Sequence, residues 1–223
     1  MRKLILLICL LLMISPVQSQ LLYKYSLSLD TPPPDIGLSG NGITDLFIQD
    51  FQDSTILWAG TGNGLSRLNI DTDTWKSFSR KHGFGKGGIS AMAVDGDVIW
   101  IATVYDTTTD VEGVVQAGGG LAYTLNGGRQ WKYVPQPTDN TNIWNTTWGI
   151  AIVDSTVWIG SFAGGLQKST SWKDPRWVSE YYEIDWQLVE PDEYNFDPVE
   201  YANHRVFSVE YIDDVLWVGT AQG

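Results

Sequence analysis

One six-residue pattern occurs four times along the chain and constrains its fold more than any other feature. Each copy is an apolar run centred on a tryptophan and closed by a small residue and a hydroxyl residue. The four copies are Ile56–Thr61, Val98–Thr103, Thr156–Ser161 and Val215–Thr220. Recurrence every ~40 to 60 residues is typical of folds that repeat one supersecondary unit. We therefore expect one structural unit per tryptophan.

The residues around each copy predict the content of that unit. An alternating apolar run precedes each copy, and an acidic turn such as Asp95–Asp97 joins the two. A Gly-Leu pair follows each of the first three copies, and then a polar turn and an aromatic run follow the first two. Short β-rich runs joined by Asp, Gly and Ser turns are antiparallel strands. Four such strands form the blade of a β-propeller, so we predict an all-β propeller of four-stranded antiparallel blades. A β-sandwich remains possible on strand count alone.

The spacing of the copies places the blades. We predict blades at about 43–79, 89–134 and 147–188, and half a blade at 205–223, together a partial propeller over 38–223. The fourth strand of the third blade falls near Trp177 or near Trp186. Closed propellers have about four to eight blades, so we expect a fragment of a longer protein. The residues assigned to structural packing of the repeat are Trp58, Gly60, Trp100, Trp158, Gly160, Trp217 and Gly219.

The N-terminus resembles a secretory signal peptide. Arg2 and Lys3 precede an apolar run over 4–14, and Val17–Ser19 suits cleavage after Ser19. The alternative is an uncleaved anchor. We expect residues 20–37 to form an N-terminal strand and a Pro-rich linker, and no membrane segment to follow the signal peptide. The predicted location is secreted, periplasmic or at the cell surface.

Charge and cysteine content narrow the classes of function. The net charge of −12 argues against nucleic acid, which requires clustered Lys and Arg. The one cysteine, Cys9, lies in the signal segment, so the mature chain has no Cys-based metal site. The expected partners are a small molecule or glycan, or another protein.

Two segments resemble known propeller repeats. The stretch from Leu38 to Leu65 resembles the two-component-regulator propeller repeat, and 83–103 resembles it with Ala102 in place of glycine. That resemblance implies a bacterial extracytoplasmic propeller that senses a ligand without a catalytic residue. The stretch Thr124–Trp131 is similar to the Asp-box, with Asn126 and Gln130 replacing the usual residues, and implies a structural hairpin turn. Asp-box propellers include sialidases, so the alternative is a secreted glycan-active hydrolase.

Strand parity, the alternating direction of successive strands, decides at which end of a blade each connecting loop lies and so predicts where a ligand would bind. The long segments 104–117, 135–145 and 180–204 all fall at one end of the blades, and functional residues favour loops on a rigid scaffold. Aromatic side chains mixed with carboxylates and arginine suit a sugar or amino-acid ligand. The candidate ligand-binding residues are Arg80, His82, Tyr105, Asp106, Asp110, Trp144 and Arg205. Ordinary solvated loops would have a similar composition.

Metal and catalytic sites are weakly indicated. Residues 180–200 contain eight carboxylates, which makes Ca²⁺ binding possible, but the EF-hand spacing is absent and an acidic surface loop is the simpler interpretation. We assign no metal ligand, cofactor or catalytic residue. A glycosidase needs two carboxylates that face each other across a cleft, which a sequence does not reveal.

Overall fold

The computed structural model describes residues 37–137, 142–169, 184–189 and 196–223. Within these ranges the regular structure is β-strand, apart from two 3-10 helices of one turn, η1 (Arg80–His82) and η3 (Ala202–His204). The expected signal peptide, the N-terminal strand and linker up to residue 36, and much of the acidic stretch 180–200 lie outside the described residues. No helix in the described ranges has the length and apolarity needed to cross a membrane.

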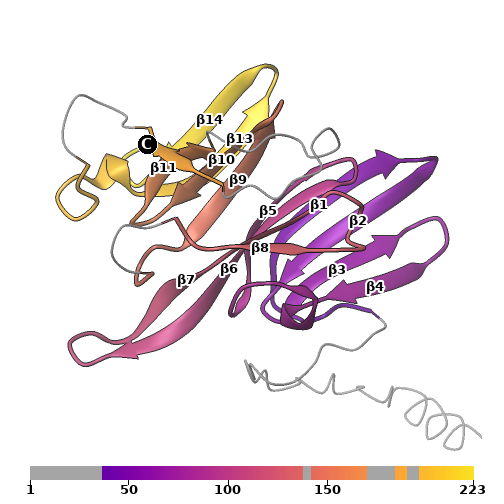
Figure 1. The fold of residues 1–223 in the computed structure, drawn as a ribbon, viewed down its shortest axis with the longest axis horizontal. Coiled ribbons are helices and arrows are strands. Elements are labelled where there is room, and N and C mark those ends of the chain that lie inside the picture. The colour runs from indigo at the N-terminus through magenta and orange to yellow at the C-terminus, as the bar shows by residue number, and fades with distance from the viewer. Residues whose placement is uncertain (1–36, 138–141, 170–183, 190–195) are drawn as a thin grey trace, which may run out of the picture.

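The strands form successive antiparallel sheets in chain order, and the prediction of an all-β propeller-type fold is confirmed. The first blade contains β1 (Ile43–Phe51), β2 (Ser54–Thr61), β3 (Gly64–Asn69) and β4 (Thr74–Phe78). The second contains β5 (Gly88–Asp95), β6 (Val98–Thr109), β7 (Gly113–Thr124) and β8 (Lys132–Val134). The third contains β9 (Thr147–Val153), β10 (Thr156–Ser161), β11 (Gly165–Ser169) and β12 (Trp186–Leu188). A two-stranded sheet, β13 (Val206–Ile212) and β14 (Val215–Thr220), follows them, and Figure 1 shows the sheets arranged one after another.

The repeated tryptophans occupy the same register position in every sheet. Each lies on the second strand, two residues before the Gly or Ala that closes the motif. Their partners on the first strand are Phe47 for Trp58, Ala93 for Trp100, Ala151 for Trp158 and Glu210 for Trp217. A bulge near the start of the first strand accompanies each pairing. The four units are therefore built to one plan.

The core lies between adjacent sheets, and the burial of each tryptophan follows from what covers it. Trp58 belongs to the cluster between the first two blades, and Trp100 to the cluster between the second and third. Their exposed fractions are 1% and 0%. Trp158 faces only the two-stranded sheet and is half-buried. Trp217 has no sheet after it in this chain and is 62% exposed.

The expected long loop between residues 104 and 117 is instead a β-hairpin, so that prediction is wrong. Strands β6 and β7 continue past the blade and pair from Val104↔Gly118 to Thr109↔Gly113. Residues 107–109 are threonines and residues 114–115 are valines, and such β-branched residues favour strand over loop. We call residues 104–118 the projecting hairpin, and Figure 1 shows it extending beyond the sheets.

Candidate functional site

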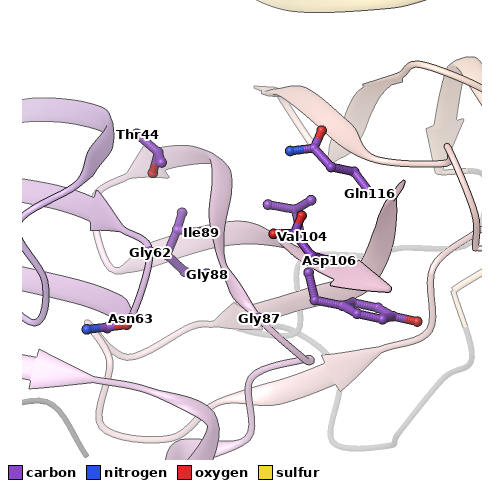
Figure 2. Close-up of a pocket in the computed structure, with 10 residues that line it drawn as sticks. Thr44, Gly62, Asn63, Gly87, Gly88, Ile89, Val104, Asp106 and Gln116 are labelled. Atoms are coloured by element: carbon purple, nitrogen blue, oxygen red, sulfur yellow. The ribbon is translucent and has the colours of Figure 1, made fainter. Parts of the chain in front are cut away.

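A pocket of about 240 Å³ opens between the first two blades, at the end that carries the projecting hairpin. The turn after β2, the segment before β5 and the hairpin all contribute to its wall, as Figure 2 shows. The residues that line it are Thr44, Gly62, Asn63, Gly87, Gly88, Ile89, Val104, Tyr105, Asp106 and Gln116. Two of the predicted ligand-binding residues, Tyr105 and Asp106, are thus brought to one cavity.

Glycines in the pocket lining allow backbone segments to pack closely, both between the two blades and within the second blade. A Cβ on Gly88 would lie 2.6 Å from Cα of Gly62, on the opposing turn. A Cβ on Gly87, which has φ of +96°, would lie 1.8 Å from the carbonyl oxygen of Val104. No side chain fits at either position without a shift of backbone. Part of the pocket wall is therefore close-packed backbone.

The polar side chains around the pocket form no hydrogen bonds with other parts of the protein that the structure describes. Thr44, Asn63, Asp106 and Gln116 form no side-chain hydrogen bond within the described residues. They supply one carboxylate, two carboxamides and one hydroxyl, which together donate and accept hydrogen bonds. Because all four line one cavity, they are available to a bound molecule.

Tyr105 has a defined orientation beside this polar group. The Nζ of Lys86 lies 3.9 Å from the centroid of its ring, within the range of a cation–π contact. Nearby, the pKa of Tyr133 is raised, mainly by burial and secondly by the charge of Tyr105. The Tyr133 hydroxyl donates to the carbonyl of Gly119 at 3.4 Å. An aromatic ring with a held orientation can stack against a ligand ring.

A second group of side chains lies at the same end of the third blade. We call Trp144, Phe162 and Phe207 the aromatic patch. The ring centroids of Trp144 and Phe162 are 6.0 Å apart, and those of Phe162 and Phe207 are 5.7 Å apart. Trp144 is 41% exposed and Phe207 44% exposed. The guanidinium carbon of Arg205 lies 5.4 Å from the Phe162 ring centroid, so the structure brings Trp144 and Arg205 to one patch.

The projecting hairpin connects the aromatic patch to the pocket. The indole Nε1 of Trp144 donates to Oε2 of Glu112 at 2.9 Å. The backbone N–H of Trp144 donates to the carbonyl of Gln116 at 2.8 Å, and Trp144 adopts a φ of +59°. A left-handed conformation is rare for a bulky residue and costs ~1–3 kcal/mol. The hairpin contacts therefore hold Trp144 in a conformation that it would not adopt alone.

The guanidinium group of Arg205 forms its hydrogen bonds with backbone carbonyl groups. Its Nε donates to the carbonyl of Pro198, and its Nη2 donates to the carbonyl of Val199 at 2.9 Å. These bonds fix the guanidinium against Phe162. Its charge therefore contributes to the patch from a fixed position.

The other predicted site residues lie away from the pocket. Arg80 is exposed on η1, and Asp110 is exposed at the turn of the projecting hairpin. His82 Nδ1 accepts the backbone N–H of Ser79 at 2.9 Å, and its ring meets Phe78 edge-on at 5.7 Å. His82 therefore has a structural contact at the start of η1. None of the three is among the residues that line the pocket.

Sequence reasoning missed three of the four polar side chains that line the pocket. Thr44, Asn63 and Gln116 were not among the candidates, nor were Phe162 and Phe207 of the aromatic patch. Asn63 and Phe162 lie in the turns between the second and third strands, which strand parity places at this same end. A search of those short turns would have identified both.

Metal binding receives no support from the part of the chain that the structure describes. No group of three or more His, Cys, Asp or Glu side chains is arranged to hold a metal ion there. Five of the eight carboxylates on which the possible Ca²⁺ site rested, those at 180–183 and 190–195, lie outside the described residues.

Comparison with known proteins gives matches in structure only. No family model matches the chain, and no curated protein matches it. The computationally designed Ika4 protein is 14% identical with a TM-score of 0.47, over 85% of this chain and 92% of that one. The extracellular domain of a protein named as a candidate one-component system from B. thetaiotaomicron is 16% identical with a TM-score of 0.45. That match covers 79% of this chain but only 26% of the other, so this chain spans about a quarter of that domain.

Proposed function

We propose that this chain is a non-catalytic ligand-binding module of an extracytoplasmic sensor or interaction protein. The ligand binds in the pocket between the first two blades. One observation carries the proposal: the side chains of Thr44, Asn63, Asp106 and Gln116 line a single cavity and form no hydrogen bond within the described residues. Polar groups that converge on a cavity without protein partners are the usual mark of a binding site. The signal-like segment 1–19 supports the extracytoplasmic location.

The lining favours a small polyhydroxylated or zwitterionic ligand. A cavity of about 240 Å³ is smaller than the ~300–1,000 Å³ of drug-sized pockets and fits a monosaccharide or an amino acid. Carboxamides and a hydroxyl pair with sugar hydroxyls or with an ammonium and carboxylate group. The ring of Tyr105 offers a face for stacking. Most of the exposed lining surface is apolar, which suits the ring carbons of a sugar or the side chain of an amino acid beside these polar groups.

The hydrolase alternative gains nothing from the pocket. A glycosidase of the two-carboxylate type needs a second acid about 5–10 Å from the first. The lining contains one carboxylate, that of Asp106. We therefore keep binding as the proposed activity.

A ligand screen followed by matched variants tests the proposal. The purified protein is screened by thermal shift against monosaccharides, oligosaccharides and amino acids, and the best ligand is titrated by calorimetry. Asp106→Asn and Gln116→Ala should each weaken binding about fivefold or more, the loss expected for one good hydrogen bond. Neither should lower the melting temperature of the unliganded protein, because neither side chain bonds to the protein.

Asp110→Asn is the matched control. Asp110 is an exposed aspartate on the same hairpin, and it lies outside the pocket lining. Its substitution should leave the dissociation constant unchanged. Equal effects of the Asp106 and Asp110 variants, or full binding after both pocket substitutions, would refute the assignment.

A further inference from the structure

A second, more polar pocket lies at the opposite end of the same two blades. Its volume is about 480 Å³. The turns between first and second strands and the Asp-box-like turn of the second blade contribute to it. Its wall includes Trp58, Arg67, Asp97, Asn126 and Arg129. None of these residues lines the pocket at the hairpin end, so the two sites are independent.

Two arginines line this second pocket, and most of their guanidinium N–H groups have no acceptor within the described residues. Neither Arg67 nor Arg129 forms an ion pair within the described residues. The indole Nε1 of Trp58 is buried and has no hydrogen-bond partner. This nitrogen is closed off from solvent, so it does not reach into the cavity. The guanidinium groups of Arg67 and Arg129 lie in one cavity without an anionic partner, which favours a bound species that accepts hydrogen bonds.

The two guanidinium groups have defined surroundings. The Cζ of Arg67 lies 5.8 Å from the centroid of the Trp58 ring. The Nε of Arg129 donates to the carbonyl of Asn126 at 3.1 Å. Asn126 in turn is fixed, because its Oδ1 accepts from the Thr124 hydroxyl at 3.0 Å and from the backbone N–H of Gln130 at 2.9 Å. The turn thus acts as a rigid support for Arg129.

Charge also favours an anion here. Burial lowers the pKa of Arg67, and the nearby carboxylate of Asp97 only partly opposes this effect. The charge of Arg67 is therefore incompletely compensated. The chain has only 14 Lys and Arg against 26 Asp and Glu, so two arginines that share a cavity with one carboxylate, Asp97, depart from the overall charge balance.

We propose that this pocket binds the oxyanion group of a small polar ligand, held by the guanidinium groups of Arg67 and Arg129. Planar guanidinium groups match carboxylate, sulfate and phosphate oxygens with paired hydrogen bonds. The amide of Asn126 lies in the same wall and suits the uncharged part of the ligand. The site gives the Asp-box-like turn a role in positioning Arg129 as well as in folding.

NMR titration of the ¹⁵N-labelled protein at low ionic strength tests this site. The probes are sulfate, inorganic phosphate and glucuronate, with glucose as the neutral control. Saturable shifts of the Trp58 indole signal are expected with at least one anion and not with glucose. Glucuronate alone would identify a carboxylate ligand, and sulfate or phosphate would identify a tetrahedral oxyanion.

Single-residue variants distinguish anion binding in this pocket from general attraction of anions to positive charge. Arg129→Gln should weaken binding about tenfold, the loss expected for a charge-assisted hydrogen bond, and Arg67→Lys should weaken it because the planar fork is lost. Asp97→Asn should strengthen binding several-fold, because it removes a negative charge that repels the anionic ligand. Lys76→Gln, an exposed change of the same charge outside the pocket, should have no effect.

Three results would overturn the proposal. They are an absence of saturable shifts with all three anions, equal binding of glucose, and equal weakening by the Arg129 and Lys76 variants.

Discussion

Substitution of Trp100 by alanine should cost far more stability than the same change at Trp217, although the two occupy equivalent register positions. Trp100 has no exposed surface; its ring lies 4.7 Å from the Tyr123 ring and 6.3 Å from the Trp186 ring. Loss of a fully buried tryptophan costs ~3–5 kcal/mol, and the aromatic contacts favour the upper part of that range. Trp217 is 62% exposed, so scaling by its buried two-fifths predicts a loss of ~1–2 kcal/mol.

Urea denaturation followed by far-ultraviolet circular dichroism measures both losses. Tryptophan fluorescence is less suitable, because the chain contains 11 tryptophans. A stability of ~5–15 kcal/mol is typical of a domain, so Trp100→Ala can unfold the protein outright, and Trp100→Phe provides a milder variant that should also lose more than Trp217→Ala. Equal losses at positions 100 and 217, or a larger loss at 217, would refute the assignment of Trp100 to a core between blades.

Two further predictions concern single contacts. Burial raises the pKa of Asp45 above its usual 3.8, although the backbone N–H of Met92 donates to it. The folded state therefore holds this proton more tightly than the unfolded state. Stability should fall as the pH rises from about 4 through the raised pKa, and Asp45→Asn should flatten that part of the profile in urea midpoints; an unchanged slope would contradict the burial. Gly64 has φ of +144°, and a Cβ there would lie 2.2 Å from the carbonyl oxygen of Phe78, so Gly64→Ala should lose ~1–3 kcal/mol. Gly42→Ala faces open space and should be nearly neutral, and similar melting temperatures for the two variants would count against this geometry.

The architecture was predictable because its signal is local and repeated. In each unit a tryptophan stands two residues before a small residue. This tryptophan occupies the same position on the second strand of its blade, on the side that faces the next blade. The burial of each tryptophan was not predictable in the same way. The burial of each tryptophan depends on the sheet that packs over it. Trp100 and Trp217 therefore differ in exposure although their local sequences are nearly the same.

The site was predictable by region and only partly by residue. Strand parity placed Tyr105 and Asp106 at the end of the blades where the pocket lies, but it treated residues 104–117 as a loop. Pairing of β6 with β7 brings Gln116 opposite Asp106, and this cross-strand contact has no signal in the local sequence. The second pocket was missed for a similar reason. Arg67 and Arg129 come from different blades, so only the packing of the blades brings them together.

Hydrogen–deuterium exchange with and without the strongest stabiliser from the ligand screen tests the central proposal most directly. If the ligand binds between the first two blades, the amides around Asn63, Gly88 and Asp106 should exchange more slowly in its presence. The turn at Asn126, at the far end of the blades, should be unchanged by this ligand. Protection confined to the Asn126 end, or protection absent from all three segments at saturating ligand, would contradict the proposed binding site.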